Sequence, residues 1–193
     1  MALILASTSP IRRQTLEAAG VDLEARRPDV NEDEAKVRLN DATDIAGELA
    51  CAKALSVSTG RSGDWVIGSD SVVSSDGRLF DKPKDRADAV EHLRFFSGKP
   101  MFLTSAVALA LDGNIAWQHV ETATLQVRQL SDEFIETYLD AEWPEVGYTV
   151  GVFRLEGRGV QLFESIDGDH FTILGMPLLP LLGALRERGL LQS

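Results

Sequence analysis

The chain has 193 residues, 44% of them hydrophobic and 25% charged, a composition typical of a folded globular domain rather than a disordered chain. Its 19 basic and 30 acidic residues give a formal net charge of −11, which disfavours binding to a nucleic-acid polymer or an anionic membrane. The length fits a single domain over residues 1–193. If the substrate is an anion, the scarce cations must gather at one site.

The features that bear on location favour the cytoplasm. A single cysteine, Cys51, excludes an intrachain disulfide and agrees with a reducing compartment. Residues 1–6 are too short an apolar run for a secretory signal, and no run approaches the roughly 18 apolar residues of a membrane span. Cys51 lies in a helix-like stretch, where a small buried thiol is favoured over a nucleophile.

Apolar runs, turn residues and helix caps predict the order of the elements. An apolar strand over residues 3–6 leads into a helix that starts at Ser9-Pro10 and stops at Gly20. A second strand over 22–28 and an acidic, solvated loop over 28–34 follow. The later elements are a helix over 44–58, a strand over 65–73 that turns into 78–80, a helix over 85–96, a hairpin of 102–111 with 115–127, a helix over 131–141, a turn-linked pair of strands at 151–156 and 160–166, and a helix over 177–188. Strands and helices alternate in the first part of the chain, and antiparallel hairpins follow. This order predicts an α/β fold with a mixed, largely antiparallel sheet flanked by helices.

The first turn of the helix after Ser9 holds two candidate phosphate ligands, Arg12 and Arg13. Free N–H groups at a helix start, the hydroxyl of Ser7 and two guanidinium groups could converge on one phosphate. The alternative is two solvated arginines, because cations oppose the helix dipole at this end. Spacing alone leaves both interpretations open.

The strongest single pattern is the apolar run Val66–Val73, which carries Asp70, followed by Lys82 after the next turn. It places opposite charges at one strand edge, which favours chemistry on a charged substrate. Phosphate-binding loops, dinucleotide fingerprints and serine-hydrolase elbows are absent from the sequence, and the three scattered histidines do not have zinc-site spacing. Carboxylates such as Glu32 and Asp70 suit Mg²⁺ or Mn²⁺ together with substrate phosphates.

Over almost its full length the chain resembles the Maf-type nucleoside triphosphate pyrophosphatases. The matching blocks, in order, are residues 5–13, 28–32, 52–54, 68–73, 81–83, Leu93 with 97–98, 151–159 and 174–178. The resemblance implies a two-lobed fold of the Maf and inosine triphosphatase kind with a central cleft. It also implies hydrolysis of nucleoside triphosphates to nucleoside monophosphate and pyrophosphate with Mg²⁺ or Mn²⁺, and suggests a homodimer.

The same resemblance assigns roles to individual residues. Asp70 is the expected proton acceptor and, with Glu32, a metal ligand. The residues expected to hold the triphosphate are Ser7, Arg12, Arg13, Lys53 and Lys82.

Three further positions are implied to select the base: Ile11, Ser71 and Glu156. Glu156 stands where the dTTP/UTP branch has Gln, which favours the 7-methyl-GTP branch, because a carboxylate can accept from guanine N–H groups or offset the charge of a methylated ring. The alternative is a Glu156 that is merely solvated beside a turn.

Departures from the family pattern keep other functions open. Asn31 replaces an acidic residue, Met101 replaces a histidine, and Glu48 replaces a basic residue where it could pair with Lys53 and weaken phosphate binding. One alternative is therefore a nucleotide-binding regulator of cell division with little or no catalysis. Another is a plain protein-interaction domain.

Overall fold

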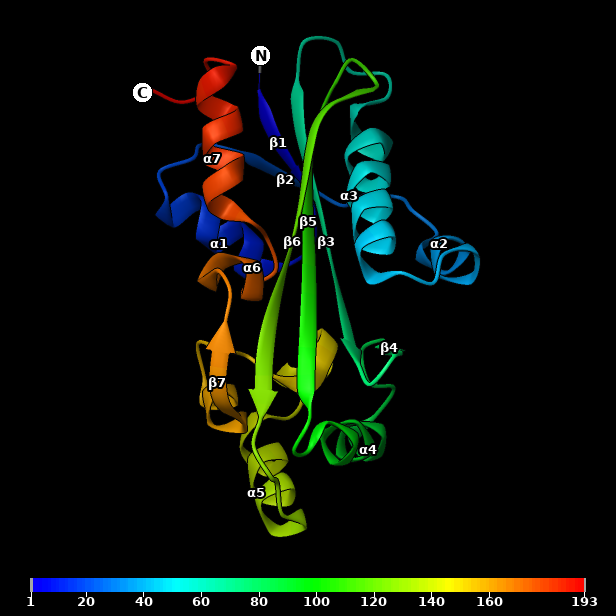
Figure 1. Cartoon of the computed structure of the whole chain (residues 1–193). Coiled ribbons are helices and arrows are strands. Elements are labelled where there is room, and N and C mark those ends of the chain that lie inside the picture. The colour runs from blue at the N-terminus through cyan, green and yellow to red at the C-terminus, as the bar shows by residue number, and fades with distance from the viewer. Residues whose placement is uncertain (1, 193) are drawn as a thin grey trace. The chain divides into compact units, whose positions relative to one another are not determined.

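The computed structural model describes residues 2–192, which form two compact units (Figure 1). Unit 1 comprises the residues up to Ser71, Thr104–Glu121 and the residues from Asp169 on, and unit 2 comprises Val72–Leu103 and Thr122–Gly168. The strands of the described chain are β1 (Leu3–Ala6), β2 (Glu24–Arg26), β3 (Trp65–Ser75), β4 (Arg78–Phe80), β5 (Pro100–Leu111), β6 (Asn114–Val127) and β7 (Phe163–Asp167). The helices are α1 (Pro10–Ala18), α2 (Glu32–Arg38), α3 (Ala42–Ser58), α4 (Arg86–Phe96), α5 (Asp132–Glu142), α6 (His170–Ile173) and α7 (Leu178–Glu187), with short 3-10 helices η1 (Glu145–Tyr148), η2 (Val150–Val152) and η3 (Arg158–Leu162).

Seven strands of the described residues form one sheet in the order β2-β1-β3-β5-β6-β7, with β4 paired to β3. β1 runs parallel to both of its neighbours, so that Leu5 pairs with Ala25 of β2 and with Ile67 of β3. The β3–β4 and β6–β7 pairs are antiparallel. The predicted α/β fold, a mixed sheet flanked by helices, is confirmed.

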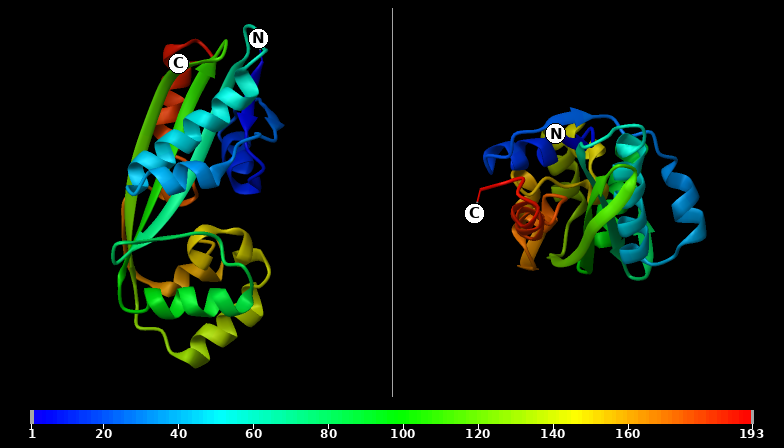
Figure 2. Two further views of the ribbon diagram at one scale, coloured as in Figure 1. Left: turned by 90° about the vertical axis from the view of Figure 1, so that its right-hand side faces the viewer. Right: turned by 90° about the horizontal axis from the view of Figure 1, so that it is seen from above.

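Unit 1 is built around apolar side chains of β1, β3 and β5. Leu5, Ile67 and Leu109 are fully buried and pack with Leu16 of α1 and Leu185 of α7. Seen from above in Figure 2, α1 and α7 lie on one side of these strands, and α2 and α3 lie on the other. Both faces of the strands are therefore covered, which explains why their sequences are nearly continuous apolar runs.

Gly68 sets the distance between β3 and α3. A Cβ atom at this position would lie 2.1 Å from the backbone oxygen of Ala50 and 2.5 Å from the backbone nitrogen of Ala54. Only glycine allows the helix to approach the strand this closely. The contact brings the middle of α3 next to the stretch of β3 that carries Asp70.

Unit 2 is organised by capped helices and aromatic packing. Asp85 and Ser131 accept N-capping hydrogen bonds at the starts of α4 and α5. The rings of Phe80 and Phe96 meet edge-on with centroids 4.6 Å apart, which fixes β4 on α4.

Two predicted segments are wrong, and the predicted strand over 160–166 is wrong in part, because residues 160–162 lie in η3 and β7 begins only at Phe163. The acidic run expected to form a loop over residues 28–34 begins α2, because Glu32 and its two acidic neighbours occupy the positive first turn while Lys36 and Arg38 occupy the last turn. Residues 151–156 do not form a strand. Gly151 and Val152 have φ angles of 81° and 58°, which interrupt an extended backbone, and β7 pairs with β6 instead.

Among residues 2–192, none of the helices has both the length and the apolar character that spanning a membrane requires.

Candidate active site

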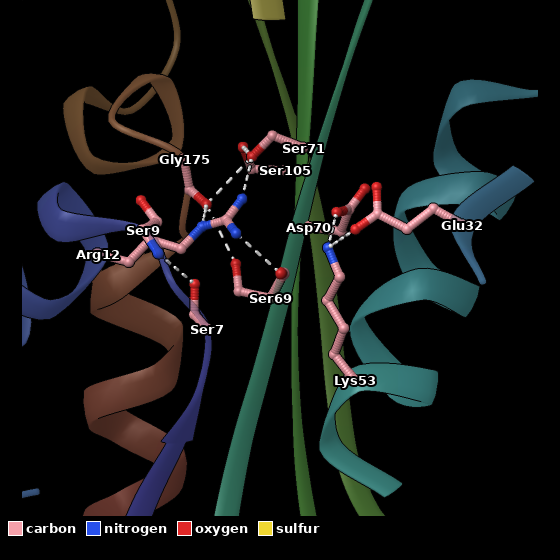
Figure 3. Close-up of polar contacts among 10 residues, drawn as sticks. All are labelled: Ser7, Ser9, Arg12, Glu32, Lys53, Ser69, Asp70, Ser71, Ser105 and Gly175. Carbon is pink, nitrogen blue, oxygen red and sulfur yellow. Dashed lines mark hydrogen bonds and ion pairs between the residues drawn. The ribbon is translucent and has the colours of Figure 1, made fainter. Parts of the chain in front are cut away.

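Two clusters of polar side chains lie on opposite faces of β3, and both belong to unit 1 (Figure 3). Successive side chains of a strand alternate between its faces, so Asp70 points one way while Ser69 and Ser71 point the other. The lysine cluster comprises Glu32, Lys53 and Asp70. The arginine cluster comprises Arg12, Ser69, Ser71, Ser105 and Gly175.

In the lysine cluster one ammonium group serves two carboxylates. Nζ of Lys53 lies 2.5 Å from Oδ1 of Asp70 and 2.7 Å from Oε1 of Glu32. The side chains of Lys53 and Asp70 are only 10% and 9% exposed, whereas that of Glu32 is 45% exposed. Because a buried charge is costly without a partner, Lys53 and Asp70 each make the burial of the other tolerable. Glu32 forms the solvent side of the cluster.

Local sequence explains how these three residues meet. Lys53 lies on the face of α3 that also buries Leu49 and Ala54, and the close approach at Gly68 holds that face against β3. Glu32 is the first residue of α2, where a carboxylate is favoured by the helix dipole.

In the arginine cluster the guanidinium group of Arg12 is held by three acceptors, two on β3 and one in the segment between α6 and α7. Nε donates to the carbonyl of Gly175 (2.8 Å), Nη1 to the carbonyl of Ser69 (2.9 Å) and Nη2 to the hydroxyl of Ser71 (2.8 Å). Ser105 Oγ lies 2.9 Å from the same hydroxyl. A guanidinium group has five N–H bonds, so two remain for a ligand.

Burial lowers the pKa of Arg12, while the nearby charges of Asp70 and Glu32 raise it. An arginine stays protonated throughout the physiological range despite such a shift. Arg12 is thus a fixed positive charge that lies within electrostatic range of both carboxylates of the lysine cluster.

The other predicted phosphate ligands at the start of α1 differ from one another. Ser7 is buried, and its Oγ accepts from the backbone N–H of Ser9 (3.1 Å), which turns the chain into the helix without a side-chain cap. Arg13 is exposed and pairs with Glu17 (2.7 Å), outside the arginine cluster. Ile11 is partly buried on α1.

Lys82 and Glu156 belong to unit 2, whereas both clusters belong to unit 1. Lys82 is exposed in the segment between β4 and α4, and Glu156 is exposed in the turn between η2 and η3. Close to Glu156, Arg154 Nη2 donates to the buried carboxylate of Glu142 (3.1 Å).

The residues that depart from the family pattern have structural roles in this chain. Glu48 pairs with Arg38 of α2 and not with Lys53, so the expected weakening of Lys53 by Glu48 is wrong. Asn31 is the N-cap residue of α2, with no side-chain cap hydrogen bond. Met101 is buried in unit 2, and its sulfur would lie 3.3 Å from a Cβ atom at Gly151.

Cys51 is partly exposed rather than buried, and its thiol donates to Oε1 of Gln118 (2.9 Å). Burial and, secondarily, the charge of Glu48 raise the pKa of the Cys51 thiol. A raised pKa lowers the fraction of reactive thiolate, so this cysteine is a poor nucleophile.

Metal ligation can be judged from the donor set. The described residues contain no group of three or more His, Cys, Asp or Glu side chains placed to hold a metal ion. The lysine cluster supplies two carboxylates, and Mg²⁺ or Mn²⁺ in nucleotide enzymes commonly takes one or two carboxylates together with water and substrate phosphate. Asp70 and Glu32 are donors of the type that such an ion takes, and in this structure Nζ of Lys53 contacts both of them.

Sequence reasoning missed Ser69, Ser105 and Gly175 as site residues. Ser69 and Gly175 stood inside blocks that supported the family resemblance, but their contacts with Arg12 depend on segments more than 50 residues apart in sequence. Ser105 stood in an apolar strand with no motif around it, so the sequence carried no signal for it.

Known proteins similar to this chain share most of its length. A family model described as Maf-like protein matches residues 2–188. A 7-methyl-GTP pyrophosphatase of Rhizobium etli is 47% identical over 191 residues, covering 97% of this chain and 96% of the relative. A nucleoside triphosphate pyrophosphatase of Nitrobacter hamburgensis is 46% identical, covering 98% and 95%. Among solved structures, a HAM1 protein from Coxiella burnetii matches in part, with a TM-score of 0.43, 13% identity and coverage of 65% of this chain and 72% of that one.

Proposed function

This chain belongs to the Maf family, and we propose that it hydrolyses nucleoside triphosphates to nucleoside monophosphate and pyrophosphate with the help of a divalent metal ion. Two full-length relatives named as pyrophosphatases of this kind support the reaction class. The observation that carries the proposal is the lysine cluster, in which a buried Asp70 is held by Lys53 beside a more exposed Glu32.

In the proposed reaction a water molecule attacks the α-phosphorus, and the bond from that phosphorus to the oxygen bridging to the β-phosphate breaks. Asp70 accepts the proton that the water loses, and pyrophosphate leaves. Lys53 holds Oδ1 of Asp70 and so fixes the orientation of the carboxylate. A divalent ion held by Asp70 and Glu32 would add positive charge beside the phosphate oxygens.

The triphosphate is proposed to lie against the cations of the site. Arg12 offers its two remaining N–H bonds, and Ser7 lies in the turn between β1 and the helix that carries Arg12. Lys53, Arg13 and Lys82 complete the proposed set. In a chain with a net charge of −11, an anionic substrate needs cations such as these to bind.

For the base, we propose 7-methylguanine. The support is the name of the Rhizobium etli relative and the exposed Glu156, whose carboxylate can accept from guanine N–H groups. Ile11 and Ser71 are the other proposed selecting positions.

The test is pyrophosphate release from 7-methyl-GTP, dTTP, UTP and the common nucleoside triphosphates with Mg²⁺ or Mn²⁺. Replacing Asp70 by Asn removes the proton acceptor, and we expect a fall of at least about 100-fold in kcat. Asp44→Asn, an exposed change on α3, is the matched control and should keep full activity. Release that is absent for every substrate, or that does not depend on Asp70, would defeat the proposal.

The same assay separates the alternatives. A nucleotide-binding regulator would bind a triphosphate in calorimetry without turning it over, and a protein-interaction domain would bind none. Pairing of Glu48 with Arg38 removes one of the departures from the family pattern that pointed to the regulator. A homodimer and a cytoplasmic location remain predictions, and light scattering of the purified protein tests the first.

A further inference from the structure

A chain of hydroxyl groups runs from Arg12 into the interior of unit 1 (Figure 3). We propose that Ser105, a residue buried in β5, is a positioning residue for the reaction, because it directs the hydroxyl of Ser71 and thereby the guanidinium group of Arg12. This inference rests on the proposed function, in which Arg12 binds the triphosphate.

The direction of every proton in the chain follows from one acceptor. Oγ of Ser105 lies 2.8 Å from the carbonyl oxygen of Thr172, which can only accept, so Ser105 spends its single proton there. In the 2.9 Å contact between Ser71 and Ser105, Ser71 is then the hydroxyl with a proton left to donate, and its other acceptor within reach is the carbonyl of Gly175 (3.1 Å). The oxygen of Ser71 is left to accept from Nη2 of Arg12.

Thr172 is a firmly held end point for this chain. It is fully buried, its N–H donates to the capping carboxylate of Asp169 (3.0 Å), and its own hydroxyl donates to Glu121 (2.6 Å). The carbonyl to which Ser105 donates therefore has a fixed position. This buried carbonyl orients the hydroxyl of Ser105, which in turn orients the hydroxyl of Ser71.

Gly175 closes the arrangement on the other edge of the guanidinium group. Its carbonyl accepts from Nε of Arg12 (2.8 Å) and from the hydroxyl of Ser69 (3.1 Å), which occupies both lone pairs. The hydroxyl of Ser71 also lies 3.1 Å from this oxygen, and turning toward it would compete with Arg12. Oγ of Ser105 accepts the Ser71 proton instead, so the carbonyl of Gly175 stays available to Nε of Arg12.

A consequence concerns the base-selecting role that the family resemblance gives to Ser71. Its hydroxyl accepts from Arg12 and donates to Ser105, so its single proton is already used within the protein. Ser71 therefore cannot donate to a base edge without giving up its contact with Ser105, and part of its influence on the substrate passes through the position of Arg12.

The experiment compares Ser105→Ala with wild type in two assays: calorimetric binding of inorganic tripolyphosphate, and KM and kcat for the best-hydrolysed substrate. Without the Ser105 hydroxyl, the Ser71 proton turns to Gly175 and Arg12 loses its fixed orientation. We expect tripolyphosphate binding to weaken about tenfold and KM to rise by a similar factor with little change in kcat, the pattern for a lost ground-state contact.

Ser58→Ala is the matched control. Ser58 is as fully buried as Ser105, also lies in unit 1, and has a hydroxyl that accepts from the N–H of Gly113. It should leave binding and KM unchanged. Should Ser105→Ala fail to fold, Ser71→Ala cuts the same chain one link closer to Arg12 and is measured in its place.

The decisive comparison repeats Ser105→Ala in an Arg12→Lys background, where the penalty should vanish, since there is no guanidinium group left to position. A penalty of unchanged size in that background, or wild-type binding by Ser105→Ala, overturns the inference. Asp70-dependent hydrolysis by the wild type would then leave the proposed function standing. A wild-type protein that neither binds tripolyphosphate nor hydrolyses any substrate overturns both.

Discussion

At the scale of single residues, the buried pair Lys53–Asp70 makes a prediction about stability. Lys53→Met keeps a side chain of similar length but leaves the nearly buried carboxylate of Asp70 without its cation. Breaking a buried pair in this way costs about 3 kcal/mol of the free energy of unfolding. Urea unfolding measures this loss, and pyrophosphate release should be abolished in the same variant.

Two companion variants show whether the charge of Asp70 is the cause. Lys53→Met combined with Asp70→Asn removes both charges and should recover much of the lost stability without restoring activity. Arg38→Met breaks the exposed pair with Glu48 and should have only a small effect. Equal losses in Lys53→Met and Arg38→Met would show that burial of the pair does not matter.

The residues of the site also show what sequence reasoning can and cannot foresee. Lys82 was expected beside Asp70 and Lys53 was expected as a phosphate ligand, whereas in the structure Lys53 is the cation that contacts Asp70, at 2.5 Å. The contacts of Ser105 could not be foreseen, because its neighbours Ser71 and Thr172 come from strands and loops far away in the chain. Residue type predicts which chemistry is available. Only the tertiary fold determines which hydroxyl groups come into contact with one another.

At the scale of elements, the approach of α3 to β3 predicts a strong effect of Gly68→Ala. The new methyl group would overlap backbone atoms of Ala50 and Ala54, which cannot rotate away, so the helix must shift and carry Lys53 away from Asp70. We expect a loss of about 3 kcal/mol, the upper end of overpacking costs, together with loss of activity. Thermal unfolding and pyrophosphate release measure the two effects.

Gly183→Ala on α7 is the control for that prediction. A Cβ atom there meets nothing within 4 Å, so the change should instead stabilise the helix by about 1 kcal/mol. If Gly68→Ala were as stable and active as Gly183→Ala, the close contact between β3 and α3 would not be what places Lys53.

Elements with strong local signals agree with their predictions, and the two exceptions have physical causes. The limits of α1, α4 and α7 follow from Pro10, Asp85 and Gly189, whose backbone or side-chain properties act locally. The run that starts α2 was assigned to solvent on its charge alone, although acidic residues also stabilise a helix start. The left-handed backbone of Val152 has no sequence signature, because β-branched residues rarely adopt it.

At the scale of the whole molecule, the distribution of strands between the two units predicts how the chain unfolds. β3, β5 and β6 each contribute residues to both units: β3 crosses from one to the other after Ser71, β5 at Thr104 and β6 after Glu121. Unfolding one unit alone would interrupt three strands in their middle and expose unpaired backbone groups. We therefore expect a single cooperative transition, in keeping with one domain over the whole chain.

Calorimetry with and without a bound ligand tests whether the two units unfold in a single transition. The calorimetric and van't Hoff enthalpies of unfolding should agree. A ligand that binds only the folded protein, present at about 100 times its dissociation constant, adds about 2.7 kcal/mol, so pyrophosphate with Mn²⁺ should shift the entire transition upward. Two resolved transitions, of which only one moves with the ligand, would show that the units unfold independently and that the active-site residues of unit 1 respond to substrate without unit 2.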